Sequence, residues 1–181
     1  LSLPSMVSEG AEGPTVSGTL TRNVVSSQAI VVELTSNNPL LVGVPVTVTI
    51  PAGVAFATFP ITVADDDLVN GSRSATITAR IQPTAGGAPF AEGAATAIQE
   101  VIDNDGPTLF VSFNRDTLAE GAVTSATIRR NTTDLSQPLV VTLQSSDVTE
   151  LTAPVTATIP AGATSVTVSV AGVEDNEVDG D

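Results

Sequence analysis

The feature that most constrains the fold of this chain is an internal repeat. Ile50-Pro51-Ala52-Gly53 recurs as Ile159-Pro160-Ala161-Gly162, an offset of 109 residues. Ordered landmarks at a near-constant offset are the signature of a repeated unit, so we expect two copies of one domain. The other matching pairs, at offsets of 109 or 108, are 66–71 with 175–180, Ser27-Gln28 with Ser136-Gln137, Arg22-Asn23 with Arg130-Asn131, and Glu12-Gly13 with Glu120-Gly121.

The boundary between the copies is predicted at Gly106-Pro107, where a Gly-Pro pair interrupts two strand-like stretches. Domain 1 is then 1–105 and complete, 106–107 is a short linker, and domain 2 is 108–181. Domain 2 stops after its fifth expected strand, so we expect it to lack its last two strands. Exposed strand edges recruit other strands, so domain 2 should be less stable or be completed by intermolecular contact. The absence of a signal segment before Leu1 suggests a piece of a longer protein.

Within each copy the dominant pattern is the alternation of apolar and hydroxyl side chains. Val46, Val48 and Ile50 alternate with threonines, and the same pattern occupies 165–170. This period of two predicts half-buried strands. About seven short strands in about 105 residues, separated by Gly, Pro, Asn and Asp, predict an all-β fold of tandem immunoglobulin-like β-sandwiches. The other expected strands lie near 16–22, 29–35, 73–82 and 94–102.

Composition excludes several classes of function. The chain has 20 Asp and Glu against 6 Lys and Arg, a formal net charge of −14, and no His, Cys, Trp or Tyr. Without thiols or imidazoles there is no disulfide and no His or Cys metal site. Phosphate binding needs clustered basic residues, so nucleic acid is not an expected partner. A carbohydrate site would need flat aromatic rings, and short repeated domains rarely form a deep cleft, so we expect no enzyme.

The acidic residues gather at strand ends. Asp65-Asp66-Asp67 follows one expected strand, and Asp103 and Asp105 follow another. Residues i and i+2 of an extended chain project to the same side, so Asp103 and Asp105 can point at one place. Converging carboxylates repel unless a cation neutralises them, and Ca²⁺ takes 6 to 8 oxygens from flexible loops, whereas Mg²⁺ fits less well. The alternative is that these loops are merely solvated and keep the protein soluble.

Four ordered landmarks together resemble the Calx-β domain. These are Val7-Ser8-Glu9-Gly10, Ile50-Pro51-Ala52-Gly53, the stretch 65–71, and Val101-Ile102-Asp103-Asn104-Asp105. The resemblance covers one full copy and about two thirds of another. Calx-β domains resemble immunoglobulin-type sandwiches and occur in sodium/calcium exchangers, in an integrin subunit and in tandem in large bacterial surface proteins. The resemblance therefore implies a calcium-binding repeat.

The resemblance also implies a ligand set. In the members of the family that bind calcium, ligands come from the first Glu, from an acidic residue after the third strand, from the Asp cluster after the fifth strand and from the acidic end of the last strand. Two positions depart from this pattern, because Asn38 and Asn70 stand where acidic residues are expected. For copy one the implied ligands are Glu9 or Glu12, since the register there is ambiguous, with Asp65, Asp66, the Leu68 carbonyl, Asp103 and Asp105; for copy two they are Glu120, Asp147, Glu174, Asp175 and Asp179.

The function predicted from these residues is a calcium-binding structural or adhesive repeat module, with Ca²⁺ stiffening the domain and its junction. The expected location is extracellular or at the cell surface, membrane-associated as part of a larger protein, because extracellular modules use weak calcium sites. The expected partners are calcium, neighbouring repeats and a cell-surface ligand. Two alternatives stay open: a metal-free structural spacer of the same fold, and a calcium-sensing regulatory module of a transporter.

Overall fold

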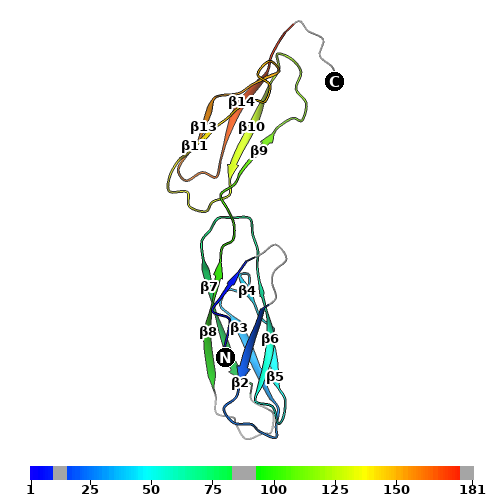
Figure 1. The fold of residues 1–181 in the computed structure, drawn as a ribbon, viewed down its shortest axis with the longest axis vertical. Helices are drawn as coiled ribbons and strands as arrows, with labels where there is room; N and C mark the ends of the chain where they lie inside the picture. The colour runs from blue at the N-terminus through cyan, green and yellow to red at the C-terminus, as the bar shows by residue number, and fades with distance from the viewer. Residues whose placement is uncertain (10–15, 83–92, 176–181) are drawn as a thin grey trace. The chain divides into compact units, whose positions relative to one another are not determined.

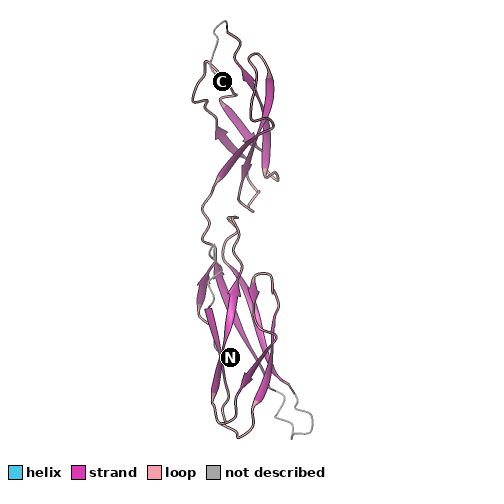
Figure 2. Cartoon of the chain, turned by 90° about the vertical axis from the view of Figure 1, so that its right-hand side faces the viewer, coloured by secondary structure: helices cyan, strands magenta, loops and turns pink. Residues whose placement is uncertain are grey.

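The computed structural model describes residues 1–9, 16–82 and 93–175. In these ranges every regular element is a β-strand, as Figure 2 shows. None of the described residues forms a helix with the length and apolarity needed to cross a membrane. The expectation of an all-β, immunoglobulin-like sandwich architecture is confirmed.

The chain forms two compact units (Figure 1). Unit 1 comprises Leu1–Asp67 and Gly71–Asp105, and unit 2 comprises Leu68–Asn70 and Gly106–Asp181. The strands of unit 1 are β1 (Met6–Ser8), β2 (Val16–Thr21), β3 (Ile30–Ser36), β4 (Val42–Gly43), β5 (Thr47–Ile50), β6 (Phe56–Val63), β7 (Arg73–Ile81) and β8 (Ala94–Ile102). Those of unit 2 are β9 (Leu109–Phe113), β10 (Val123–Arg130), β11 (Leu139–Thr142), β12 (Leu151–Thr152), β13 (Thr156–Ile159) and β14 (Ser165–Gly172).

Unit 1 is built from two sheets that enclose its core. One has the order β1-β8-β7-β3-β5 and the other the order β2-β6-β4. Alternate residues of the central strands are buried, as the period-two pattern predicts. The buried apolar residues that form this core include Ile30, Val32 and Leu34 of β3, Ala75, Ile77 and Ala79 of β7, and Phe59, Ile61 and Val63 of β6.

Unit 2 repeats part of this arrangement. Its sheets have the orders β12-β14-β10-β9 and β11-β13. By sequence offset, β11 and β13 correspond to β3 and β5, and β10, β14 and β12 correspond to β2, β6 and β4. Among the described residues of unit 2 there is no counterpart of β7 or β8.

A compensating pair of side chains shows that both units use one packing plan. In unit 1, Gly18 lies opposite Phe59, and a Cβ at Gly18 would collide with the Phe59 ring. In unit 2 the matching pair is Ala126 opposite Val168. Unit 1 pairs the smallest residue with a large aromatic ring, and unit 2 pairs a slightly larger residue with a smaller side chain. Both combinations keep the interior filled.

Each unit also contains an arginine that ties its loops together. Arg22 donates hydrogen bonds to the carbonyls of Val54 at 2.6 Å and Gln28 at 2.9 Å. Arg130, which is 6% exposed, donates to the carbonyls of Ala163 at 2.8 Å and Gln137 at 3.0 Å. The repeated Arg-Asn landmark is therefore a structural clamp, because a guanidinium can satisfy several carbonyls at once.

Candidate metal centre

The strand directions of unit 1 bring acidic residues from opposite ends of its sequence to one edge. β1 pairs with β8 in parallel, with Val7 opposite Val101. The Glu9 amide continues this pairing by donating a hydrogen bond to the Ile102 carbonyl at 3.1 Å. Parallel strands end on the same side of a sheet, so Glu9 leaves the sheet beside Asp103.

Three carboxylates converge at this edge. Glu9, Asp103 and Asp105 each offer an oxygen, and these oxygens lie within 4.8 Å of one another. Glu9 is 1% exposed, while Asp103 and Asp105 are half-buried. Asp103 is held in place by two backbone amides, since its Oδ1 accepts from Asp105 at 2.9 Å and its Oδ2 from Gly71 at 2.6 Å. The Asp103 carboxylate is therefore oriented by backbone groups.

An arginine already contributes positive charge to this cluster. Arg73 is the first residue of β7 and lies opposite Val101 of β8, so it stands at the same edge. Its Nη2 donates to Glu9 Oε2 at 2.8 Å and to Asp66 Oδ2 at 3.1 Å. One guanidinium cannot balance all the carboxylates near it, and the local charge stays negative.

Two oxygens of the cluster are buried without a hydrogen bond. Glu9 Oε1 and Asp105 Oδ2 accept none from the described residues. Burial raises the pKa of Glu9, although Arg73 opposes this. Burial, followed by the charges of Asp103, Asp66, Asp65 and Asp67, raises the pKa of Asp105. A cation at this place would supply the missing interactions of both groups.

The candidate ligands predicted for copy one are distributed as follows. Glu9, Asp103 and Asp105 meet directly, and Asp66 joins them through Arg73. Asp65 lies close enough to raise the pKa of Asp105. Leu68 lies in the segment Leu68–Asn70, which is grouped with unit 2, and its carbonyl stays a predicted ligand. Glu12 lies outside the described residues, so of the two alternatives only Glu9 can be located, and it lies in the group of three carboxylates.

The candidates predicted for copy two do not converge within the described part of unit 2, where no group of three carboxylates meets. Glu120 is exposed. The carboxylate of Glu174 lies against Gly121, and Asp175 follows it in the chain. The pKa of Asp147 is lowered by hydrogen bonds from Thr149, whose hydroxyl donates at 2.5 Å, so this carboxylate closes a local turn. Asp179 lies outside the described residues.

Sequence reasoning missed Arg73. The acidic clusters were apparent from the sequence, but nothing in the pattern distinguished this arginine from the other five. The usable signal is positional: Arg73 begins the strand that follows the Asp65–Asp67 cluster, so it starts at the edge where that cluster and the end of β8 meet.

Comparison with known proteins gives no family assignment. No family model matches the chain, and no curated protein matches it. Among solved structures, the chain is similar to "CBD12 from CALX1.2", with 14% identity and a TM-score of 0.39, over 96% of this chain and 73% of that one. It is also similar to the E. coli chaperone DraB, with 10% identity and a TM-score of 0.42, over 91% of this chain and 82% of that one. Similarities this distant carry no functional assignment.

Proposed function

We propose that unit 1 binds a calcium ion through Glu9, Asp103 and Asp105, and serves as a calcium-stabilised structural or adhesive module of a larger extracellular or surface protein. The observation that carries the proposal is the buried Glu9 carboxylate, whose Oε1 has no hydrogen bond and lies in a group of converging acidic oxygens. Burying a carboxylate is costly unless it is paired and hydrogen-bonded. A cation would meet that requirement.

The chemistry of the donors favours calcium over other ions. Glu9, Asp103 and Asp105 all offer carboxylate oxygens, and the chain contains no His or Cys for zinc or copper. The carboxylates come from a strand end and the loops beside it, and Ca²⁺ accepts such irregular sets, with backbone carbonyls and water completing 6 to 8 ligands. Mg²⁺ demands an octahedral arrangement at shorter distances. Asp66, which shares the Arg73 guanidinium with Glu9, is proposed as a further ligand together with Asp65.

One observation favours the second candidate, a metal-free spacer. Arg73 already pairs with Glu9 and Asp66, at 2.8 and 3.1 Å. In that case the guanidinium is the permanent counterion and the acidic loops serve solubility. The two functions differ in how calcium affects stability. An ion that binds only the folded state stabilises it by about 2.7 kcal/mol at a hundredfold excess over Kd, whereas calcium leaves the stability of a metal-free spacer unchanged.

Thermal unfolding with saturating calcium and with a chelator tests the proposal. Unfolding is monitored by far-UV circular dichroism, because the chain has no Trp or Tyr. Calcium should raise the melting temperature of unit 1, at about 4–8 °C per kcal/mol for a domain of this size. The triple variant Glu9→Gln, Asp103→Asn, Asp105→Asn should lose the increase. The matched control, Glu120→Gln, Glu174→Gln, Asp175→Asn, makes the same charge change in unit 2 and should keep it. Equal melting with calcium and chelator would favour the spacer.

The proposal extends to the junction of the two units. Asp105 immediately precedes Gly106, where unit 2 resumes, and Asp103 lies two residues before Asp105. A metal that holds both carboxylates would restrict the backbone at that point, whereas glycine permits rotation. Small-angle X-ray scattering with and without calcium measures this through the breadth of the distance distribution, which should narrow with calcium. An unchanged profile, with the thermal shift present, would confine the metal's role to unit 1.

A further inference from the structure

Gln99 is a fully buried polar residue at a position where the strand pattern of β8 places apolar side chains. Along this strand Ile98 and Glu100 are exposed. Gln99 and Val101 alternate with them on the side of the core, and they are 0% and 1% exposed. Among the described residues of unit 1, the only other buried polar side chain is that of Glu9. Burying an amide is unfavourable unless its groups are hydrogen-bonded, so the place of Gln99 requires an explanation.

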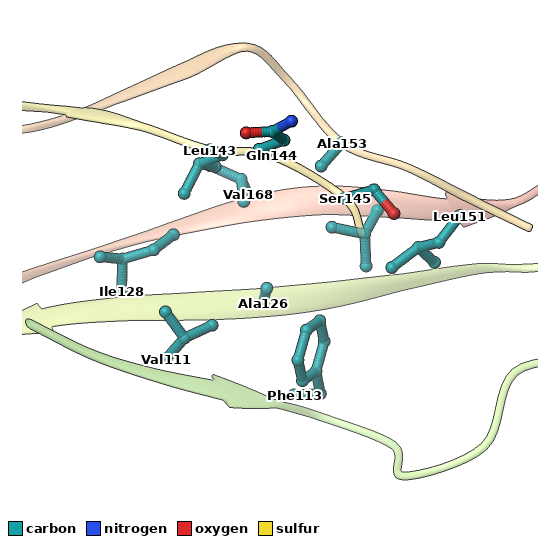
Figure 3. A pocket seen from close by; sticks show the side chains of 11 residues that line it. Val111, Phe113, Ala126, Ile128, Leu143, Gln144, Ser145, Leu151, Ala153 and Val168 are labelled. Carbon is teal, nitrogen blue, oxygen red and sulfur yellow. The ribbon is translucent and has the colours of Figure 1, made fainter. Parts of the chain in front are cut away.

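A glutamine of unit 2 that borders apolar side chains is placed differently. Gln144 lines the apolar pocket of unit 2 together with Leu143 and Ile128 (Figure 3), yet Gln144 is an exposed residue. Exposure leaves its amide in contact with water, which is the usual situation of glutamine in proteins. The full burial of Gln99 is therefore tied to its particular surroundings.

The amide of Gln99 is only half satisfied. Its Nε2 donates to the Glu100 carbonyl at 3.0 Å, but its Oε1 accepts no hydrogen bond from the described residues. Arg73 has the opposite deficiency. Its Nη2 donates to Glu9 and Asp66, while its buried Nε donates to no acceptor among the described residues. Gln99 therefore has a spare buried acceptor, and Arg73 has a spare buried donor.

The strand register makes these two residues neighbours. In the antiparallel pair of β7 and β8, Arg73 lies opposite Val101, and Ala75 lies opposite Gln99. Arg73 and Gln99 are thus diagonal neighbours on the same face of the sheet, and long side chains reach across such a diagonal. The other diagonal position from Arg73 belongs to Asp103, just past the end of β8. Arg73 therefore has an acidic acceptor on one side and a neutral amide acceptor on the other.

A cation in the candidate metal centre would disturb the bonds of Arg73. Calcium bound by Glu9, Asp103 and Asp105 would repel the guanidinium and compete with it for the Glu9 oxygens. A partly buried guanidinium that loses these acceptors needs others, because an unpaired buried charge is costly. Gln99 Oε1 is neutral and buried, and it accepts no hydrogen bond from the described residues, so it is suited to receive the Arg73 Nε–H.

We propose that Gln99 is a positioning residue of the candidate metal centre. In the metal-free protein Arg73 pairs with Glu9, and when calcium occupies the site the Arg73 Nε–H donates to Gln99 Oε1. Gln99 thereby lowers the cost of displacing the arginine and raises calcium affinity without contacting the ion. This inference rests on the proposed calcium site and adds to it the residue that controls its counterion.

The first test observes the Arg73 Nε–H group by NMR in the isotope-labelled full chain, with the signal assigned by its loss in Arg73→Gln. Saturating calcium should slow the exchange of this hydrogen with water by about tenfold or more relative to chelator. Gln99→Met should abolish that change, because methionine keeps an unbranched side chain and removes the amide oxygen. The Arg22 Nε–H, which donates to the Val54 carbonyl, is the internal control and should not change.

The second test is a double-mutant cycle read by calorimetric titration with calcium. Gln99→Met should weaken calcium binding by about tenfold in the wild-type background, because a hydrogen bond to a charged group is lost in the calcium-bound state only. In the Arg73→Gln background the same substitution should leave the affinity unchanged. Ile50→Met, at another buried position of unit 1, is the control for core repacking and should change the affinity in neither background.

The outcomes separate this inference from the proposed function. A wild-type chain that binds no calcium would refute the calcium site, and this inference with it. Wild-type binding together with an equal effect of Gln99→Met in both backgrounds, or with no effect in either, would overturn this inference alone. An Arg73 Nε–H that is equally protected with calcium and with chelator would overturn it as well. If Gln99→Met does not fold, as melting in chelator would reveal, the Nε–H exchange of the wild-type chain still decides.

Discussion

Units 1 and 2 follow one sequence plan, yet the described residues of unit 2 include no counterpart of two strands that help to enclose the core of unit 1. In unit 1, β7 and β8 cover the core and also end or begin at the acidic edge, where Arg73 and Asp103 lie. In the described part of unit 2 neither strand has a counterpart; Leu143 is only half-buried, and no group of three carboxylates forms. β8 therefore contributes both to core closure and to the candidate metal site, where it meets the end of β1, while β7 contributes Arg73. In unit 1 the three carboxylates are brought together by the ends of β1 and β8, so the acidic cluster at 65–67 is not by itself what defines the candidate site.

The largest expected effect concerns core closure. Leu34→Ala should destabilise unit 1 by about 2–5 kcal/mol, because a buried leucine loses its contacts and leaves a cavity. Leu143→Ala, at the equivalent position, should cost roughly half of that or less in unit 2, since Leu143 already borders open space. Urea unfolding followed by circular dichroism measures both. Equal losses would mean that unit 2 is closed in solution.

The next effect concerns the arginine clamps, which both units share. Arg130→Ala should destabilise unit 2 by about 2 kcal/mol, because several carbonyls lose a charged donor. The neighbouring Arg129 offers a control with the same charge change, since it rests on Phe110 at the surface. Arg129→Ala should cost under about 1 kcal/mol. If the two variants were equally stable, the clamp would have no special role.

A smaller and more diagnostic effect concerns Arg73. Arg73→Gln removes the partner of the buried Glu9 and should destabilise the calcium-free protein by about 1–3 kcal/mol. It should also raise calcium affinity, because the ion no longer competes with a guanidinium. Isothermal titration calorimetry and melting in chelator measure the two changes. Arg80→Gln is the matched control, in the same strand but exposed, and should alter neither. A loss of calcium binding in Arg73→Gln would contradict the account.

The smallest effect is on pH dependence, and it has opposite signs in the two units. The raised pKa values of Glu9 and Asp105 mean that folded, metal-free unit 1 holds these protons more tightly than the unfolded chain does. Its stability should therefore fall as pH rises from the ordinary carboxyl pKa of about 4 through the raised values. In unit 2 the pKa values of Asp134 and Asp147 are lowered, by bonds from Ser136 and Thr149. The stability that these two carboxylates contribute to unit 2 is therefore present above the ordinary carboxyl pKa, and it is lost as pH falls through the lowered pKa values.

Calcium binding should respond to the same groups. The ion requires ionised carboxylates, so the calcium-induced rise in melting temperature should shrink as pH falls through the raised pKa values of Glu9 and Asp105. Melting curves between pH 4 and 7, with calcium and with chelator, measure this. A rise that is constant across that range would place the ligands elsewhere.

Much of the fold could be predicted from the sequence, because alternation and turn residues are local signals. The expected strands at 94–102 and 73–82 agree with β8 and β7 to within a residue. The acidic residues of the site were also apparent. The sequence does not tell which of these acidic residues meet. Their meeting depends on the parallel pairing of β1 with β8, in which Val7 lies opposite Val101, a residue far away in the sequence. The role of Arg73 depends on the same long-range pairing.

Hydrogen exchange of the full chain, with saturating calcium and with chelator, compares the two units most directly. The account predicts that calcium slows exchange at 6–9 and 100–105, where β1 and β8 end beside Glu9 and Asp103, and leaves β9, β10 and β14 of unit 2 unchanged. The variant Glu9→Gln should weaken the effect in unit 1. Exchange that calcium leaves unchanged in unit 1, or slows equally in both units, would contradict the claim that the site lies where β1 and β8 end.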